Sequence, residues 1–244
     1  HEITLSGAAI EVRLYAEDPG ANFLPQTGKV LRWQPANIPG VRIDHGMREA
    51  GEVSPHYDPM VAKVIAYGKT RTDAARLLAR ALDDTVLLGV NHNKQFLTNL
   101  LRHPVFISGD TSTAFIEQHF ADDISLKPAV AGHEALLVAA ALFLKDLPSH
   151  FHTGLPGATP LILQCSDIKT TLRLMMDNGV LSAEINGAQC SLTVISEQET
   201  SLLYEVDGVR RRIAVARDGN NVFLATANGN LHPTEITQTP PDTT

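Results

Sequence analysis

The first clear pattern along the chain is a strict alternation of apolar and polar residues between Ala9 and Pro19. One side of an extended chain carries Ile10, Val12, Leu14 and Ala16, and the other side carries Glu11, Arg13, Tyr15 and Glu17. A period of two that ends at a proline predicts a half-buried β-strand. The polar face combines a guanidinium, carboxylates and a phenol, which suits a binding site; a solvated outer face with a loose Glu/Arg pair gives the same pattern.

Short strands and amphipathic helices are predicted in the rest of the first half. The expected elements are strands at Lys29–Trp33, Val41–Asp44 and Val61–Tyr67, a helix at Asp73–Leu82, and a helix capped by Asn91 that runs through Leu101. This mixture is typical of an α+β unit. The pattern lapses around residues 121–131, where we expect a domain boundary.

The second half begins with a helix pattern, Glu134–Leu147, that is apolar on nearly all sides but too short to span a bilayer. Five Asn-Gly or Asp-Gly pairs, which favour tight hairpins, follow it. About eight strand-like runs are predicted: Pro160–Gln164, Thr171–Met176, Val180–Ile185, Gln189–Ile195, Leu202–Val206, Val209–Ala216, Val222–Thr226 and Leu231–Ile236. One antiparallel sheet would expose its apolar face, so we expect it to close like a barrel around the helix.

These patterns predict an α+β fold with two domains. We expect the first domain at 1–123, a linker at 124–131, the helix-in-barrel domain at 132–237, and the start of a flexible linker at 238–244.

Composition narrows the function classes. The 244 residues include 43% hydrophobic and 19% charged residues, as in a globular protein with sizeable cores. The net charge of −7 argues against non-specific nucleic-acid binding, and no apolar run is long enough to suggest a membrane span. Two cysteines suggest a reducing compartment. The sequence opens without methionine or a targeting segment, so we expect it to be a piece of a longer protein.

Few catalytic motifs are present. The sequence contains no phosphate-binding glycine loop, H-E-x-x-H, paired-cysteine motif or G-x-S-x-G. His150 and His152 have no third ligand nearby, so no metal site is expected. The remaining candidates are the polar strand face and the loop His56–Met60, where Asp58 before Pro59 also fits a simple turn.

Four segments resemble, in order, the C-terminal part of a biotin carboxylase domain: Gly7–Pro19, Phe23–Gly28, His56–Lys63 and Gly109–Ile116. The second half resembles the helix-in-barrel (BT) domain of acyl-CoA carboxylase α subunits. The 3-methylcrotonyl-CoA carboxylase type is favoured, with the geranyl- and propionyl-CoA types as close alternatives.

The resemblance implies a role for the polar strand. Biotin carboxylase uses ATP and bicarbonate to carboxylate biotin, and a fixed guanidinium stabilises negative charge on the ureido oxygen. By matching position, the resemblance implies that Arg13 is the catalytic arginine that contacts biotin and that Glu11 supports it. It also implies that Tyr57 and Asp58 lie beside the biotin site and that Thr113 lies near the adenine pocket. Arg42 matches an arginine at a subunit interface.

The resemblance also implies partners and cofactors. Biotin is attached to a carrier domain not found in this sequence, and most ATP and Mg²⁺ ligands lie upstream in the family, so the chain alone should be inactive. The BT domain implies docking on a carboxyltransferase β subunit, in bacterial cytoplasm or the mitochondrial matrix. Within the long connection Asp146–Pro160, Phe151 and Leu155 are docking candidates, unless the loop folds over its own barrel. A second hypothesis is a non-catalytic interaction module, in which the polar strand has no chemical role.

Overall fold

The structure is a computed structural model that describes residues 6–144, 159–227 and 229–236. The chain folds into two units, the first comprising residues 1–129 and 227–229 and the second residues 130–226 and 230–244. The break after residue 129 falls inside the expected linker 124–131, but the short helix η2 (Ile124–Leu126) still belongs to the first unit.

The described part of the first unit contains nine strands: β1 (Ala8–Tyr15), β2 (Glu17–Asp18), β3 (Leu24–Pro25), β4 (Gly28–Lys29), β5 (Arg32–Gln34), β6 (Val41–His45), β7 (Glu52–Val53), β8 (Met60–Gly68) and β9 (Val86–Leu88). Its helices are η1 (Pro19–Ala21), α1 (Arg71–Asp84), α2 (Lys94–Arg102), α3 (Pro104–Ser108), α4 (Phe115–His119) and η2. Strands β1, β8 and β6 form the main antiparallel sheet, in that order. The single strand predicted at Lys29–Trp33 is wrong: β4 pairs with β7, whereas β5 pairs with β9.

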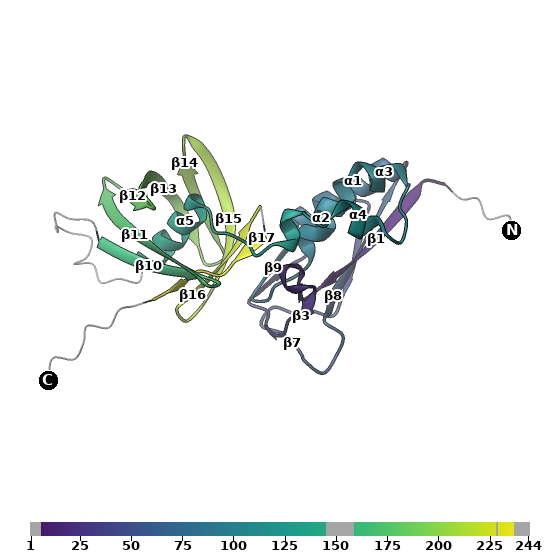
Figure 1. Cartoon of the computed structure of the whole chain (residues 1–244), viewed down its shortest axis with the longest axis horizontal. Coiled ribbons are helices and arrows are strands. Elements are labelled where there is room, and N and C mark those ends of the chain that lie inside the picture. The colour runs from purple at the N-terminus through teal and green to yellow at the C-terminus, as the bar shows by residue number, and fades with distance from the viewer. Residues whose placement is uncertain (1–5, 145–158, 228, 237–244) are drawn as a thin grey trace. The chain divides into compact units, whose positions relative to one another are not determined.

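The main sheet has one buried and one exposed face. Ile10 and Val12 of β1 and Val64 of β8 pack against Leu78 and Leu82 of α1 in one apolar cluster, and Figure 1 shows α1 and α2 on the same side of β1 and β8. The alternation in the sequence therefore predicted the buried face of β1 correctly, and its polar residues lie on the opposite face.

Side chains at the helix starts explain two differences from the sequence-based boundaries. Helix α1 begins at Arg71, before the predicted Asp73, because Thr70 and Asp73 form a reciprocal capping box. The predicted cap by Asn91 is wrong. The N-cap position of α2 is Asn93, and the Asn91 side chain instead donates a hydrogen bond to Asp18, with Nδ2 3.3 Å from Oδ2.

Among its described residues, the second unit contains α5 (His133–Leu144) and nine strands: β10 (Thr159–Cys165), β11 (Ile168–Asp177), β12 (Val180–Ile185), β13 (Ala188–Gln198), β14 (Ser201–Val206), β15 (Val209–Asp218), β16 (Asn221–Thr226), β17 (Gly229–Leu231) and β18 (Thr234–Glu235). Eight of them form a closed ring in the order β15-β14-β13-β12-β11-β10-β18-β16, closed by pairing of β15 with β16, and β17 adds to β16. The predicted strand Leu231–Ile236 is two strands, because Pro233, which has no N–H to donate, lies between β17 and β18.

Three of the predicted Asn/Asp-Gly turns have the backbone that such pairs favour. Asn178, Asn186 and Asp207 have φ of 48°, 50° and 52°, and the glycine after each also has positive φ. These turns join β11 to β12, β12 to β13 and β14 to β15. Two successive residues with positive φ match the twist of an antiparallel hairpin, so the turns fix the register of the barrel strands.

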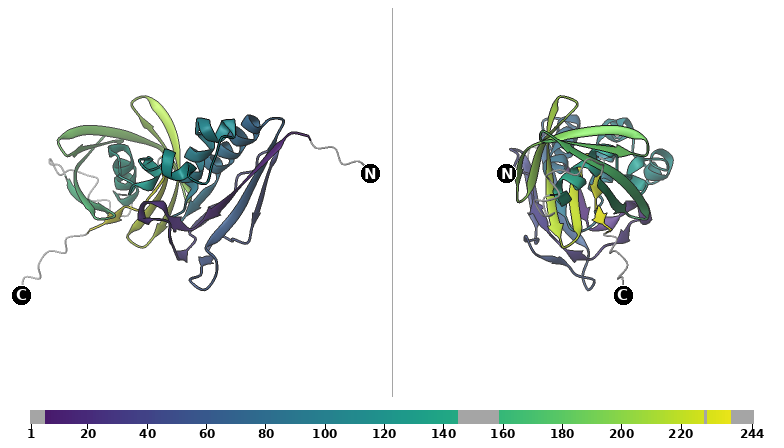
Figure 2. Two further views of the ribbon diagram at one scale, coloured as in Figure 1. Left: turned by 45° about the vertical axis from the view of Figure 1, so that its right-hand side comes forward. Right: turned by 90° about the vertical axis from the view of Figure 1, so that its left-hand side faces the viewer.

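Helix α5 fills the barrel, as Figures 1 and 2 show. Its Leu137, Val138 and Ala139 are buried together with inward residues of the strands. At its first turn, Glu134 accepts hydrogen bonds from Tyr204 and Arg211, and near its end Arg217 donates to the carbonyl of Leu142. An acidic residue at the N-terminus and a cation at the C-terminus both complement the helix dipole. The predicted extension of this helix to Leu147 lies outside the described residues.

No helix in the described part of the chain is both long and apolar enough to cross a membrane.

Candidate functional site

The exposed face of the main sheet in the first unit carries two cross-strand rows of charged residues. In one row, Arg13 of β1 pairs with Lys63 of β8, which pairs with Asp44 of β6. In the next row, Ile65 lies between Glu11 and Arg42. Because antiparallel neighbours on one face lie about 5 Å apart, the strand pairing brings these charges together on a single surface.

Arg13 is held loosely on this surface. Its side chain is 59% exposed, and its Nε lies 3.7 Å from Oε1 of Glu11. That distance is longer than a hydrogen bond, so Glu11 attracts the guanidinium without binding it tightly. Within the described residues the Arg13 side chain makes no hydrogen bond, and its terminal N–H groups remain available to an anionic oxygen.

A tighter pair lies across the sheet on β6. Arg42 and Asp44 form an ion pair with Nη2 2.6 Å from Oδ2. The hydrogen bonds from Arg42 lower the pKa of Asp44, and the charge of Lys63 acts in the same direction. The pKa of Arg42 is raised, first by its hydrogen bond to Asp44. The sequence search named Arg42 but missed Lys63 and Asp44, although their spacing on predicted strands put them on this face.

The loop before β8 reaches the end of β1. The Ala16 amide donates to the carbonyl of Pro59 at 2.9 Å, so Asp58 lies close to the end of the polar strand. Asp58 also accepts a hydrogen bond from the Met60 amide, which is the turn that the sequence allowed. Tyr57 is 81% exposed. The loop therefore offers one phenol and one carboxylate beside the strand.

Glu17 lies in β2, just beyond the end of β1. Burial raises its pKa, a hydrogen bond from Asn93 opposes that rise, and the nearby charge of Asp58 adds to it. The net effect is a raised pKa, caused mainly by desolvation.

Asn93 is a third residue near this site that the sequence patterns missed. Its side chain is buried and contacts Arg13 and Tyr15 of β1 and Glu17 of β2. The residue is 80 positions from Arg13 in the chain. An asparagine at the start of a helix predicts an N-cap, and no local sequence pattern predicts a side-chain contact with a distant strand.

The other predicted site residues are not brought to this face. Thr113 is exposed in the turn before α4, and no hydrogen bond joins it to β1 among the residues described. Phe151 and Leu155, the predicted docking residues, lie outside the described residues, as do His150 and His152. In the described ranges no three His, Cys, Asp or Glu side chains cluster in a way that could hold a metal ion.

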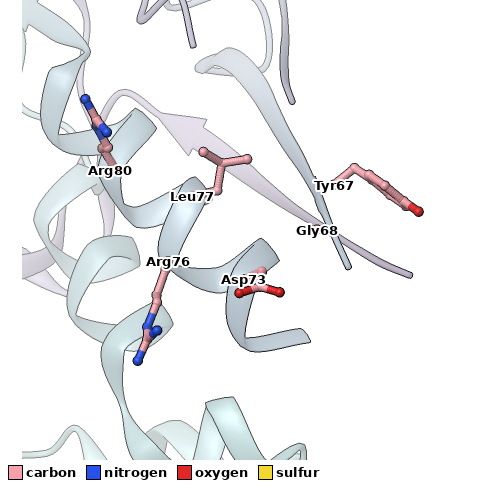
Figure 3. A pocket seen from close by; sticks show the side chains of 6 residues that line it. All are labelled: Tyr67, Gly68, Asp73, Arg76, Leu77 and Arg80. Atoms are coloured by element: carbon pink, nitrogen blue, oxygen red, sulfur yellow. The ribbon is translucent and has the colours of Figure 1, made fainter. Parts of the chain in front are cut away.

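A pocket of about 350 Å³ lies between the end of β8 and the start of α1, and Figure 3 shows its lining. The lining residues are Tyr67, Gly68, Asp73, Arg76, Leu77 and Arg80. Arg76 and Arg80 point apart in this view, and Arg80 pairs with Asp84 at 3.6 Å. The two guanidinium groups do not converge on one ligand, and none of the predicted site residues lines the pocket.

Comparison with known proteins bears directly on the first unit. Residues 11–118 match the family model of the biotin carboxylase C-terminal domain. The human mitochondrial propionyl-CoA carboxylase α chain is 32% identical over 206 residues, covering 79% of this chain and 28% of the relative. The mitochondrial methylcrotonoyl-CoA carboxylase subunit α of Dictyostelium discoideum is 35% identical over 147 residues, covering 60% of this chain and 21% of the relative.

Two facts follow about coverage. The chain spans less than a third of the length of these relatives. The match to the human α chain covers more of this chain than the first unit contains, so the similarity extends into the barrel. Among solved structures, the biotin carboxylase subunit of a pyruvate carboxylase is 33% identical with a TM-score of 0.47, covering 48% of this chain and 26% of that chain.

Proposed function

We propose that the chain forms one wall of a biotin carboxylation site, because residues 11–118 match the biotin carboxylase C-terminal domain and most of the chain is similar to a carboxylase α chain. The single observation that carries the proposal is the geometry of Arg13. An exposed guanidinium, whose terminal N–H groups have no hydrogen-bond partner among the described residues, lies on a sheet inside the matched domain.

Arg13 is the proposed catalytic residue because of the charge that develops during biotin carboxylation. When biotin loses a ureido proton, negative charge moves to the ureido oxygen, and a preorganised cation lowers the energy of that state. Glu11 attracts the Arg13 guanidinium from the same strand, while Tyr57 and Asp58 border the space beyond the strand's end. We assign the biotin contact to these four residues.

The test is Arg13→Ala in the proposed α subunit, assayed with ATP, Mg²⁺, bicarbonate and biotin. We expect biotin carboxylation to fall by about two orders of magnitude, as loss of a charge-stabilising donor typically produces. The matched control is Arg80→Ala, which removes an exposed arginine of the same unit on another surface. Full activity of Arg13→Ala would contradict the proposed role and favour a non-catalytic interaction module.

We propose that the second unit is a BT-type docking domain for a carboxyltransferase β subunit. The support is its closed barrel with one central helix, together with similarity to a carboxylase α chain that extends into it. A pull-down from the source cells with the tagged 244-residue chain should recover a carboxyltransferase subunit. Phe151→Asp should weaken that recovery if the proposed docking residues Phe151 and Leu155 contact the subunit. The control is Ile168→Asp, at an exposed position at the start of β11.

The proposed substrate is an acyl-CoA, with 3-methylcrotonyl-CoA, geranyl-CoA and propionyl-CoA as the candidates. The relatives include propionyl-CoA and methylcrotonoyl-CoA carboxylase chains, which leaves the acyl group to be decided by the recovered β subunit. We propose that ATP, Mg²⁺ and bicarbonate are bound mainly by residues outside this sequence, with Thr113 near the adenine. On this basis the 244-residue chain alone should release no phosphate above blank when given ATP, Mg²⁺, bicarbonate and biotin.

A further inference from the structure

The outer edge of β1 is completed by one asparagine. Strand β1 is at the edge of its sheet, with β8 on one side only. Backbone groups of successive residues in a β-strand point to opposite edges, so those of Arg13 and Tyr15, two positions apart, face the same edge. They face Asn93: the Tyr15 amide donates to Asn93 Oδ1 at 3.0 Å, the Asn93 amide donates to the Tyr15 carbonyl at 3.2 Å, and Asn93 Nδ2 donates to the Arg13 carbonyl at 3.2 Å.

These contacts substitute for a neighbouring strand. A side-chain amide has the same donor and acceptor as a peptide group, so Asn93 provides a short piece of β-ladder. The register between β1 and β8 shifts between Leu14 and Tyr15, and Asn93 binds the Tyr15 amide directly after that shift. Backbone groups that would otherwise be unpaired at the edge are satisfied, and the strand keeps its direction past Arg13.

The Asn93 side chain forms hydrogen bonds with β1 and not with the first turn of its own helix, α2. It occupies the N-cap position of α2, where an asparagine side chain commonly caps the helix, but here its side chain makes no cap hydrogen bond. Instead Nδ2 also donates to Oε1 of Glu17 at 2.8 Å, and the residue is only 4% exposed. A local preference given up for a distant contact indicates that the contact with β1 matters more.

We propose that Asn93 is a positioning residue of the biotin site, which holds the β1 backbone from the Arg13 carbonyl to Tyr15 and fixes the carboxyl group of Glu17. This inference rests on the proposed function, because Arg13 must be the group that contacts biotin. Asn93 acts through Arg13 and does not itself touch the reacting atoms. A small displacement of a catalytic group costs up to about 100-fold in rate, so the effect of losing Asn93 is measurable.

The test is a double-variant cycle in the proposed α subunit. Asn93→Ala should lower the biotin carboxylation rate by about 10- to 100-fold. Because Asn93 acts through Arg13, the double variant Arg13→Ala/Asn93→Ala should be no slower than Arg13→Ala alone. Asn91→Ala, which removes only the contact to Asp18, is the matched control and should keep full activity.

A second readout separates positioning from general destabilisation. Hydrogen exchange of the Tyr15 amide in the 244-residue chain should speed up in Asn93→Ala, which has no acceptor. It should stay slow in Asn93→Asp, which keeps Oδ1 and remains isosteric. Asn93→Asp should still lose rate, because the Nδ2 donations to Arg13 and Glu17 are gone.

The outcomes are distinct. Full activity of Asn93→Ala, or rate losses that multiply in the double variant, would overturn the role of Asn93 while leaving Arg13 in place. If Arg13→Ala alone is fully active, the proposed function fails and the role of Asn93 fails with it. A slow-exchanging Tyr15 amide in Asn93→Ala would show that another group holds the strand, which also overturns the proposal.

Discussion

The two units solve the same problem, the unpaired edges of a β-sheet, in different ways. The barrel pairs β15 with β16 and closes on itself around α5. The three-stranded sheet of the first unit stays open, and its β1 edge is completed by the Asn93 side chain. A closed barrel buries its inner face and leaves little room for chemistry, whereas an open sheet can expose a charged face on a rigid backing. The open unit is therefore where the proposed reaction site lies.

The largest expected effect comes from removing apolar packing inside the barrel, which tests whether the barrel is stabilised independently of the open sheet. Leu137 of α5 is 1% exposed inside the barrel core. Leu137→Ala should lower the free energy of unfolding of the second unit by about 2–5 kcal/mol, because the closed strands cannot collapse fully onto the cavity. Hydrogen exchange followed by mass spectrometry should show faster exchange in the barrel strands and unchanged exchange in β1 and β8.

The matched control is Ile168→Ala, since Ile168 is 54% exposed on the same barrel and should tolerate truncation. Equal loss of protection in both units would show that they unfold as one body. Such a result would remove the distinction between a self-contained barrel and an open site-bearing sheet.

The same distinction explains what the sequence could predict. The barrel strands follow alternation and Asn/Asp-Gly turns, signals contained within a few residues, and Val180–Ile185 was predicted to its exact ends. The buried face of β1 was equally visible. Both rest on local chain geometry, in which each residue's side is set by its neighbours.

What could not be predicted depends on contacts between distant residues. Asn91 was predicted to cap α2, but its side chain binds Asp18, and Asn93 takes the N-cap position while its side chain serves β1. At the site, Lys63 lies opposite Arg13 on one neighbouring strand and opposite Asp44 on the other. That arrangement depends on the order of the strands in the sheet, which periodicity does not fix. Arg13 itself was found because a known family carries an arginine there; the alternation alone fitted a solvated face equally well.

A smaller effect on stability is expected from the charged cluster of the second unit, at the first turn of α5. Burial of Glu134 would raise the pKa of its carboxyl, but hydrogen bonds from Arg211 and Tyr204 and the charge of Arg211 together lower it. Because the folded pKa is depressed, the stabilisation is present above the ordinary glutamate pKa of about 4.3 and is lost as the pH falls through the folded value. The barrel should therefore lose stability in acid.

Glu134→Gln should remove that acid dependence, because glutamine does not titrate. The Glu134 side chain is 34% exposed, so solvent screening limits the loss at pH 7 to about 0.5 kcal/mol. Denaturant unfolding of the barrel, detected by hydrogen exchange at several pH values between 3 and 7, measures both the acid dependence and the loss of stability at pH 7. The control is Glu205→Gln, which removes an exposed ion pair with Arg210 on the same barrel and should leave the acid dependence intact. If Glu134→Gln keeps the full acid dependence, this cluster does not anchor α5, and packing alone holds the helix in the barrel.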